Sequence, residues 1–352
     1  MRVLALTKYS RKGASSRLRF MQFKNQLRER GINVCYKVML SDRYLNTLYK
    51  SGRSSKIEII LSAIRRLAQA LKANKYDVLW IEGELFPWLP ASFEEFFIAK
   101  SPRVVFDYDD AIYLRYKKKS IPSCFPTLRN KIETLIRKSD AVIVANKNLH
   151  AFSVSAGAPK VKIIPTVVDW APFKNIPTEN RVNKKIIVGW IGTPLTSVYL
   201  KKLQPALSNL VNKNIIDVVM IGANAQDFPS NFKVIDWSEK DEAKHLFDFD
   251  VGIMPLPDNK WAQGKSGFKI IQYMAAGKAV IASPIGASND LVIQGKTGFL
   301  PTSLQEWEDA IQRMALEPEL RSEMGGLARI IAKNKYCTEA VVDDLANTLA
   351  VF

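Results

Sequence analysis

The chain has 352 residues, 47% of them hydrophobic, and a formal net charge of +17. This length predicts two domains of ordinary size, and no apolar stretch approaches the roughly 18 residues that a membrane-spanning helix needs. Three scattered cysteines and two histidines exclude a disulfide framework and a histidine-rich metal site, and without a signal-peptide pattern we expect a cytoplasmic protein.

The positive charge is confined to the first half of the chain. Residues 1–175 hold 32 lysines and arginines against 14 acidic residues, whereas the remainder is close to neutral. Such asymmetry indicates that the N-terminal half meets something anionic, namely a nucleic acid, an acidic membrane leaflet or a phosphate-bearing substrate.

Apolar, β-rich runs alternate with helical patterns along the chain. In the first half the expected strands run from "MRVLALT" to "VKIIPTVVD", with helices expected at about 15–30, 56–74, 126–138 and 146–156. In the second half they run from "KKIIVGWIGTP" to "KAVIASP", with helices at about 196–212, 239–247 and 267–276. This alternation predicts an α/β fold of two doubly wound, Rossmann-like domains followed by C-terminal helices.

The polar, proline-containing segment 173–185 is the expected linker because it interrupts both periodicities. We therefore expect a first domain over 1–175, a second over 176–334 and a C-terminal helix over 335–352 that packs back on the first domain. Ligands of open α/β sheets lie beyond the carboxyl ends of the strands, so two such domains facing one another are expected to form a cleft there.

The stretch "GKSGFKIIQYMAAGKAVIASPIGASND" has positive charges at the expected start of a helix. It reads as a helix between strands, yet Lys265 and Lys269 stand where that helix should begin. Positive charge there opposes the helix dipole, whereas a bound phosphate would reverse the sign of the interaction. We therefore expect a phosphate-bearing ligand near Lys265, Gly267 and Lys269; the alternative is that both lysines point into water.

A second glycine loop follows the first strand of the second domain. In "IIVGWIGTP", Gly192 and Thr193 stand where doubly wound folds commonly hold phosphates. The alternative is a purely structural turn, because Gly-x-x-Gly alone is a weak signal.

The block "GKSGFKIIQYMAAGKAVIASPIGASNDLVIQGKTGFL" resembles the donor-binding segment of the group 1 glycosyltransferases, glycosyltransferase family four, of the bacterial surface-polysaccharide type. Further matches are "IIPTVVDWAPF", "GWIGTP", "DVGIMPLPDNKWAQGK" and "FDYDDAIY", so the resemblance covers nearly the whole chain. It implies the GT-B fold, with a nucleotide-sugar held mainly by the second domain and the acceptor by the first. It implies no cofactor and no metal.

The resemblance also assigns donor-binding residues. The family usually has two glutamates eight positions apart, where this chain has Gly264 and Gln272. Gln272 can hydrogen-bond ribose hydroxyls because an amide both donates and accepts, whereas Gly264 offers the sugar no side chain. Since "GTPLTSVYL" lacks the family's basic residues, we expect Lys265 and Lys269 to bind the diphosphate, with Lys269 stabilising the leaving group. Trp237 is expected to flank the nucleobase, with a core position as the alternative.

In "FDYDD" the resemblance aligns Asp109 with a family histidine near the donor sugar and Asp110 with the acid after it. Paired carboxylates at a strand end can orient sugar hydroxyls or accept a proton, so both are expected to be catalytic. Helix capping and metal binding by the Asp-x-Asp pattern are the alternatives.

Acceptor-side candidates lie in the first domain. In "KYSRKGASSRLRF", Gly13 belongs to a loop that opens a helix, and Arg17 and Arg19 could grip phosphate bidentately. Glu84, which follows the third strand, is a further candidate. The alternative is a solvated basic helix face.

The segment 114–140 combines a lysine run with apolar positions at helical spacing, a pattern compatible with docking on an anionic inner leaflet; an ordinary solvated helix is the alternative. We therefore expect a retaining, metal-independent hexosyltransferase, peripheral on the cell membrane. Its acceptor would be a glycan or a saccharide linked to polyprenyl diphosphate.

Three other interpretations compete with a transferase. A non-catalytic relative would fit the missing family glutamate. A nucleic-acid-binding protein would explain the charge, but no recognition motif accompanies the basic residues, so we expect no nucleic-acid partner. A nucleotide-sugar epimerase is a weaker alternative, because its histidine-rich site has no counterpart.

Overall fold

The computed structural model describes residues 1–51, 56–117, 126–175 and 185–350. The chain divides into two units, each built on a parallel sheet of six strands. Unit 1 comprises Met1–Thr166, Gly264–Ser266 and Val341–Phe352, and unit 2 comprises Val167–Gln263 and Gly267–Ala340. The predicted α/β fold with two Rossmann-like sheets is confirmed.

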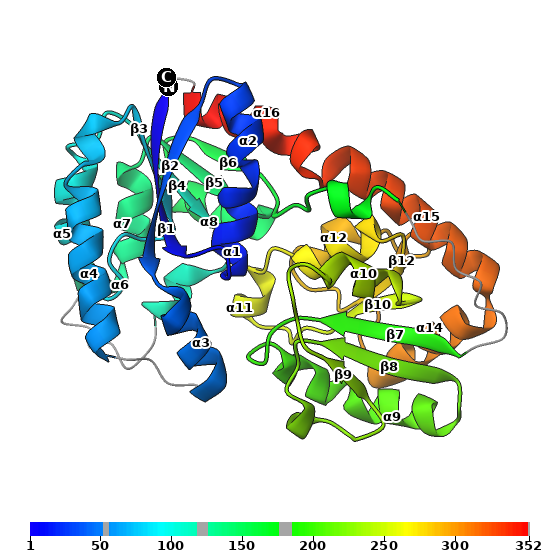
Figure 1. Ribbon diagram of the computed structural model, residues 1–352. Helices are drawn as coiled ribbons and strands as arrows, with labels where there is room; N and C mark the ends of the chain where they lie inside the picture. The colour runs from blue at the N-terminus through cyan, green and yellow to red at the C-terminus, as the bar shows by residue number, and fades with distance from the viewer. Residues whose placement is uncertain (52–55, 118–125, 176–184, 351–352) are drawn as a thin grey trace. The chain divides into compact units, whose positions relative to one another are not determined.

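The sheet of unit 1 has the strand order β2-β1-β3-β4-β5-β6 (Figure 1). Its strands are β1 (Arg2–Tyr9), β2 (Asn33–Leu40), β3 (Val78–Glu82), β4 (Val104–Tyr108), β5 (Ala141–Val144) and β6 (Val161–Ile163). Its α-helices are α1 (Ala14–Arg19), α2 (Lys24–Glu29), α3 (Asp42–Ser51), α4 (Lys56–Ala70), α5 (Ala91–Ile98), α6 (Pro126–Arg129), α7 (Lys131–Lys138), α8 (Lys147–Ser155) and most of α16 (Thr338–Ala350).

The central strands of unit 1 are buried along their whole length and mostly apolar, because helices cover both faces of the sheet. Every residue of β3, β4 and β5 is buried. Figure 1 shows α4 and α5 on one side of this sheet and α1 and α2 on the other. The polar residues that end these buried strands are therefore placed at one edge of the sheet.

The sheet of unit 2 has the strand order β12-β11-β10-β7-β8-β9. Its strands are β7 (Ile186–Ile191), β8 (Ile216–Ile221), β9 (Lys233–Ile235), β10 (Val251–Met254), β11 (Ala279–Ala282) and β12 (Gly298–Phe299). Its α-helices are α9 (Gln204–Asn212), α10 (Glu242–Phe247), α11 (Lys260–Gln263), α12 (Phe268–Ala275), α13 (Ser288–Leu291), α14 (Leu304–Leu316) and α15 (Pro318–Lys335).

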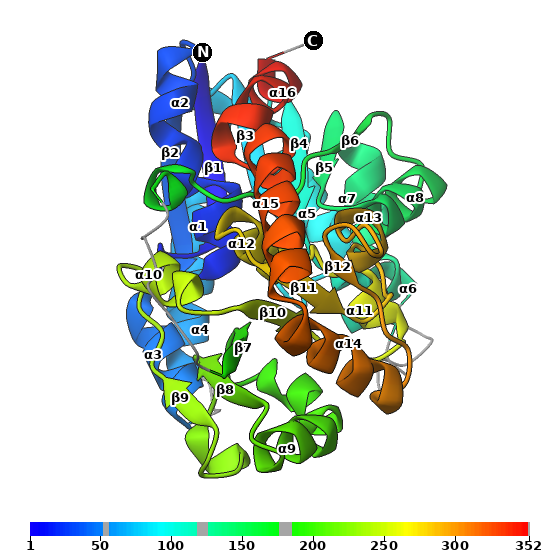
Figure 2. The same ribbon diagram turned by 90° about the vertical axis from the view of Figure 1, so that its right-hand side faces the viewer.

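Helix α15 packs closely on the second sheet. Figure 2 shows it lying over α12 and β11. At Gly325 of α15 the approach is so close that an added Cβ would lie 2.1 Å from the carbonyl oxygen of Gly277. Only glycine fits there, which fixes the position of the helix that covers α12.

Of the expected linker 173–185, residues 176–184 lie outside the described part of the chain. The chain passes from unit 1 to unit 2 at Thr166 and Val167, before that segment. Among the helices of the described ranges, none has the length and apolar character needed to cross a membrane.

Candidate functional site

Acidic side chains gather at the carboxyl edge of the first sheet. Glu82 ends β3 and is paired in register with Asp107 of β4, and Asp109 and Asp110 follow directly after β4. This is the edge at which doubly wound sheets bind ligands. The sequence-predicted pair Asp109 and Asp110 is therefore placed where substrate chemistry is expected.

A chain of hydrogen bonds connects Asp107 to Asp109 through Arg19. The Arg19 Nε lies 2.5 Å from the Asp107 carboxylate, and its guanidinium also donates to the Thr166 hydroxyl at 3.2 Å. Thr166 in turn donates to Asp109 at 3.4 Å, while the Trp80 indole donates to Asp107 at 3.2 Å. The network fixes the orientation of the carboxylates at the end of β4.

This network changes the role of Arg19. The sequence predicted that Arg19 and Arg17 bind an acceptor phosphate, but both side chains are buried. Arg19 is occupied by Asp107, Thr166 and the carbonyl of Ile164, and Arg17 donates to the carbonyl of Arg11. For Arg19 the prediction of an open phosphate grip is wrong, because its charge balances the buried Asp107.

Two carboxyl groups at this edge, those of Asp107 and Asp109, have raised pKa values. Burial, together with the neighbouring charge of Asp110 and against the opposing charge of Arg19, raises the pKa of Asp109 to about 7. Burial likewise raises the pKa of Asp107 to about 6, against the influence of Arg19. Asp109 is therefore poised to exchange a proton near physiological pH.

The segment Gly264–Ser266 joins this acidic edge within unit 1. Asn146, which follows β5, donates from its amide to the carbonyls of Gly264 at 3.1 Å and Lys265 at 2.9 Å. The Lys265 ammonium lies 3.5 Å from a carboxylate oxygen of Asp110. Lys265 therefore supplies positive charge beside the carboxylate pair, and its ammonium faces Asp110.

The glycine at position 264 has a steric cause. An added Cβ would lie 2.6 Å from the Cβ of Ala111, the residue after Asp110. The backbone thus lies too close to the end of β4 for any side chain. The glutamate that the resemblance led us to expect at this place has no room here.

The loop after β1 is built around Glu82. That carboxylate accepts hydrogen bonds from the hydroxyls of Ser15 and Ser16, both at 2.5 Å, and from the Lys8 amide at 2.7 Å. Gly13 precedes α1, where an added Cβ would collide with the Tyr9 side chain. Gly13 therefore shapes the loop through close backbone packing.

Lys8 is a candidate that the sequence interpretation missed. Burial and the nearby charge of Arg115, opposed by the nearby acids Glu84, Glu82 and Asp110, lower its pKa to about 8. The available signal was its position, directly after the apolar run of β1 and hence at the same edge as "FDYDD". A lysine that titrates near neutrality beside carboxylates is typical of functional sites.

Glu84 does not face the acidic edge as an open ligand. It lies 2.9 Å from the buried ammonium of Lys131, which also pairs with Glu94 at 2.7 Å and donates to the carbonyl of Phe86. Tyr116 donates its hydroxyl to Glu84 at 2.5 Å. The prediction that Glu84 contacts an acceptor is wrong in this structure, because the carboxylate is buried as part of an internal ion-pair network.

The segment 114–140 is only partly described, since Lys118 and Lys119 of its lysine run lie outside the described residues. Its apolar positions Ile132, Leu135 and Ile136 are buried in α7, which packs against α5. The prediction that these positions are available to a membrane is therefore wrong. Their helical spacing reflects the core of unit 1.

In unit 2 the glycine loop after β7 closes a tight turn. The Thr193 amide donates to the Thr196 hydroxyl at 3.1 Å, and the Gly192 amide donates to the carbonyl of Ile221. A Cβ on Gly192 would lie 2.4 Å from the Trp190 ring. The glycine is thus required for packing, and the turn places Thr193 at the carboxyl end of the second sheet.

Helix α12 begins near this turn. Gly267 caps it with a φ of 72°, a left-handed conformation that favours glycine. The Lys269 ammonium lies 5.5 Å from the centre of the Trp190 ring, so a cation stands in the first turn of α12 beside the strand that precedes the glycine loop. The two lysines that the sequence places at the start of this helix therefore belong to different units: Lys269 to unit 2 and Lys265 to unit 1.

Trp237 and Gln272 meet at one carboxylate. The Trp237 indole donates to Glu242 of α10 at 2.5 Å, and the Gln272 amide donates to the other oxygen of Glu242 at 2.8 Å. Gln272 itself is buried, whereas Trp237 is half-buried. Glu242, which the sequence interpretation did not single out, brings these two predicted donor-binding residues together.

Within the described ranges, His, Cys, Asp and Glu side chains form no group of three or more that could hold a metal ion. The Asp-x-Asp pattern accordingly does not present two open carboxylates, because Asp107 is bound to Arg19 and Trp80.

Comparison with known proteins finds a family match within the second half of the chain. Residues 190–316 match the family model described as glycosyl transferases group 1. No curated protein matches the sequence.

Solved structures share the fold over the whole chain. HepE from Anabaena, in complex with UDP and glucose, is 15% identical with a TM-score of 0.75, and all of both chains is covered. Sucrose-phosphate synthase from Thermosynechococcus elongatus is 15% identical with a TM-score of 0.70, covering 98% of this chain and 97% of that one. WaaG, a glycosyltransferase involved in lipopolysaccharide biosynthesis, is 12% identical with a TM-score of 0.70 and full coverage of both. The family match thus covers about a third of the chain, residues 190–316, and the solved structures show that the whole chain shares their GT-B fold.

Proposed function

We propose that the protein transfers a hexosyl group, with retention, from a nucleotide-diphosphate donor to a saccharide or lipid-linked saccharide. The observation that carries the proposal is the position of the family match. Residues 190–316 include the Gly192 turn, Trp237, Lys269 and Gln272, the residues expected to hold the donor.

In this proposal the donor diphosphate is bound at the start of α12. The first amides of a helix and a cation in its first turn both favour an anion, so Lys269 and the Gly192–Thr193 turn suit a diphosphate. Trp237 and Gln272, held by Glu242, suit the nucleoside. Since HepE has been solved with UDP and with UDP-glucose, uridine nucleotides are the first donors to test.

Asp109 and Asp110 are proposed to contact sugar hydroxyls. A carboxyl group with a pKa of about 7 can accept a hydrogen bond when ionised and donate one when protonated, and Lys265 keeps positive charge beside the pair. The leaving diphosphate would help to deprotonate the incoming hydroxyl. Lysines and helix amides would stabilise its developing charge, so the proposed reaction is independent of metal.

The proposed acceptor is a lipid-linked glycan intermediate of surface-polysaccharide assembly, met at the inner face of the cell membrane. The excess of positive charge in residues 1–175 suits a polyprenyl-diphosphate group. The fold shared with WaaG, which takes part in lipopolysaccharide biosynthesis, supports the same class of acceptor.

A transfer assay tests this function. The protein would be incubated with radiolabelled UDP-glucose and a bacterial lipid extract, and labelled lipid and released UDP would be followed. We expect Asp109→Asn to lower kcat about a hundredfold, because a positioned proton acceptor contributes that much. Asp217→Asn, an exposed acid on β8, is the matched control and should leave the rate unchanged.

If nucleotide sugars bind but neither UDP release nor transfer is found with any donor and extract, the transferase proposal fails. A non-catalytic role would then be favoured. The observation that favours this second candidate is Gly264, which has no side chain where the resemblance led us to expect a glutamate.

A further inference from the structure

Helix α4 packs with its polar side inward. Arg66 is 1% exposed and donates to the carbonyl of Lys37, within β2, and to that of Thr7, near the end of β1. Gln69 donates to a further carbonyl of β2 at 3.2 Å. The polar face of α4 thus satisfies strand carbonyls at the sheet edge, where an ordinary surface helix would bury apolar residues.

The apolar stripe of α4 is consequently left at the surface. Ile57, Ile60, Leu61 and Ile64 recur at helical spacing and are between 55% and 72% exposed. Leu71, just beyond the helix, continues the stripe. A contiguous exposed apolar stripe of this kind marks a surface that binds a partner.

The loop before α5 adds an exposed aromatic residue, Trp88, to the surface of unit 1. Trp88 is 56% exposed although its φ of 68° lies in a region that bulky residues rarely adopt. Its amide donates to the Tyr116 hydroxyl at 3.1 Å and its ring packs edge-on against that ring. Tyr116 is bound to Glu84 of the buried network, so the network holds an indole at the surface.

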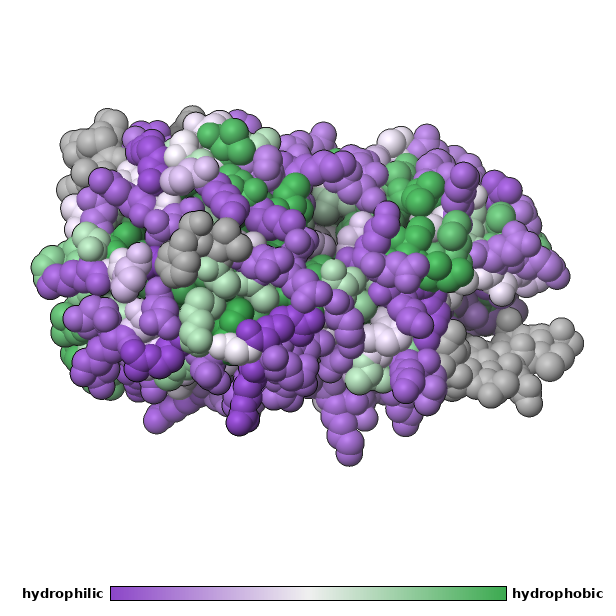
Figure 3. Space-filling view, turned by 90° about the horizontal axis from the view of Figure 1, so that it is seen from above, coloured by the Kyte–Doolittle hydropathy of each residue, from purple (hydrophilic) through white to green (hydrophobic). Residues whose placement is uncertain are grey.

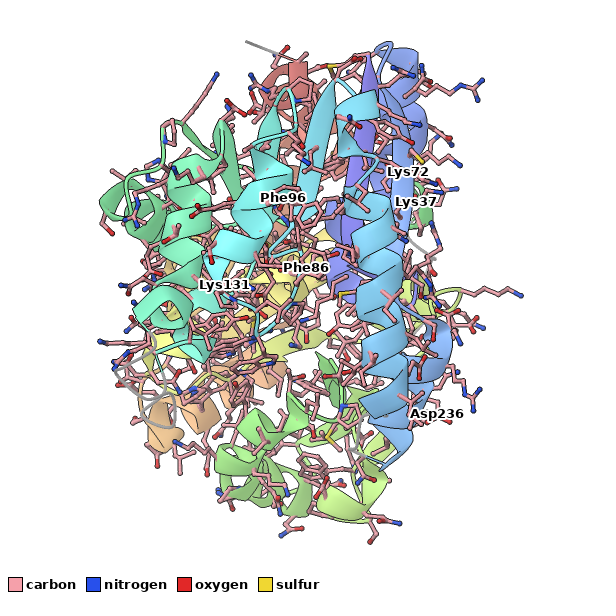
Figure 4. The ribbon with its side chains drawn as sticks, turned by 90° about the vertical axis from the view of Figure 1, so that its left-hand side faces the viewer. Lys37, Lys72, Phe86, Phe96, Lys131 and Asp236 are labelled. Carbon is pink, nitrogen blue, oxygen red and sulfur yellow. The ribbon has the colours of Figure 1, made fainter. Side chains whose placement is uncertain are left out.

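Helix α5 continues this surface with Phe93 and Phe96, both exposed. Figures 1 and 4 show α4 and α5 on the same side of unit 1, with Phe96 on α5 and Lys72 near the end of α4. Seen from above in Figure 3, apolar side chains reach the edge of the molecule on this side. We call this surface the α4–α5 face; its apolar members are Ile57, Ile60, Leu61, Ile64, Leu71, Trp88, Leu89, Phe93 and Phe96.

Exposed basic side chains lie on or directly after the two helices of the α4–α5 face, and we call them its basic border. Arg65, Lys72, Lys75 and Lys100 are exposed along the two helices and just beyond their ends, whereas the acids of these helices are buried or half-buried. The Lys100 ammonium lies 3.7 Å from the centre of the Phe96 ring. An apolar surface with a positively charged border complements a partner that is apolar below an anionic layer.

We propose that the α4–α5 face docks the protein on an anionic lipid bilayer. Tryptophan and phenylalanine insert at the level of the headgroups, aliphatic residues enter the acyl boundary and lysines bind anionic headgroups. A second copy of the chain is disfavoured, because a two-fold contact would bring the basic border against itself. The docking proposal is argued from this surface alone. It rests on the proposed function only for its purpose, because a lipid-linked acceptor would lie in a membrane.

Vesicle sedimentation tests the docking without any sugar nucleotide, so its failure and the failure of the transferase proposal are distinguishable. The whole protein would be mixed with vesicles of phosphatidylcholine alone or with 30% phosphatidylglycerol, roughly the anionic content of a cytoplasmic leaflet. We expect binding to the anionic vesicles, reduced about tenfold or more by Ile60→Asn with Ile64→Asn. Lys72→Glu with Lys75→Glu should weaken binding similarly and remove its sensitivity to salt.

Ile330→Asn is the matched control, because Ile330 on α15 is 59% exposed and Ile60 is 60% exposed. Circular dichroism and an unaltered thermal unfolding midpoint would verify that each variant is folded. Absence of binding by the wild type, or equal binding by the α4 variants, would overturn the proposal. A dimer detected by ultracentrifugation and abolished by the same α4 variants would assign the face to a second copy instead.

Discussion

At the scale of single residues, the environment of each carboxylate decides its role. Asp107 forms a buried ion pair with Arg19. Asp109, two residues further along the chain, is connected to this pair through the Thr166 hydroxyl. Asp110 faces Lys265. Three acids within four positions therefore have three different partners, and the sequence "FDYDD" alone could not assign them.

The raised pKa of Asp109 predicts a pH-dependent stability. Its pKa is 3.8 when unperturbed and about 7 in the folded protein, so between these values the folded protein binds more protons than the unfolded chain. The stabilisation is complete below about pH 4 and is lost as pH rises through 7. We expect Asp109→Asn to gain stability relative to the wild type between pH 5 and 8, on the order of 1 kcal/mol, measured by urea unfolding. A constant difference across this range would show that Asp109 titrates normally.

The catalytic role of Asp109 predicts a second pH effect. If its ionised form contacts the sugar, the wild-type kcat rises with pH through about 7, and Asp109→Asn removes this limb from its residual activity. The pH–rate profile of Asp217→Asn should match the wild type. A limb that persists in Asp109→Asn would belong to another group, with Lys8 the next candidate.

At the scale of elements, the network around Lys131 joins α7 to the loop between β3 and α5. One fully buried ammonium contacts Glu84 and Glu94, and Glu94 also accepts the amides of Leu85 and Phe86. Figure 4 shows Lys131 and Phe86 in this region beneath α5. The loop conformation, including the exposed Trp88, therefore depends on a charge network that the sequence did not reveal.

Removing the Lys131 charge should be costly. Lys131→Met leaves two buried carboxylates without their cation, and we expect a loss of about 3–5 kcal/mol in the free energy of unfolding. Lys138→Met, at the exposed end of the same helix, is the control and should change stability little. Adding Glu84→Gln and Glu94→Gln to Lys131→Met should recover part of the loss; a near-neutral single variant would mean that the network is not closed in solution.

The sequence predicts the periodic helices and strands well, but it predicts poorly which side chains contact one another. Alternating strands and helices predicted both sheets, because burial imposes the spacing of apolar residues along each element. It misassigned Arg19, Glu84 and the apolar residues of 114–140, since a buried charge and a buried stripe have the same local sequence as exposed ones. It also missed Glu242, which is distant in sequence from Gln272 and meets it only in the folded chain.

At the scale of the whole molecule, the charge asymmetry now has a structural meaning. The basic half of the sequence largely coincides with unit 1, which carries the basic border of the α4–α5 face, whereas the family match lies in unit 2. Donor recognition and attachment to an anionic partner are thus proposed for different units. Variants that abolish vesicle binding should therefore leave nucleotide binding unchanged.

The most direct measurement is calorimetric binding of UDP, GDP and dTDP, each with and without EDTA. The wild type would be compared with Lys269→Ala and with Lys213→Ala, an exposed lysine elsewhere in unit 2. We predict that one nucleotide, UDP first among them, binds in the presence of EDTA. Lys269→Ala should weaken that binding about tenfold or more, and Lys213→Ala should not. Failure of all three nucleotides to bind, or equal binding by Lys269→Ala, would contradict the proposed donor site.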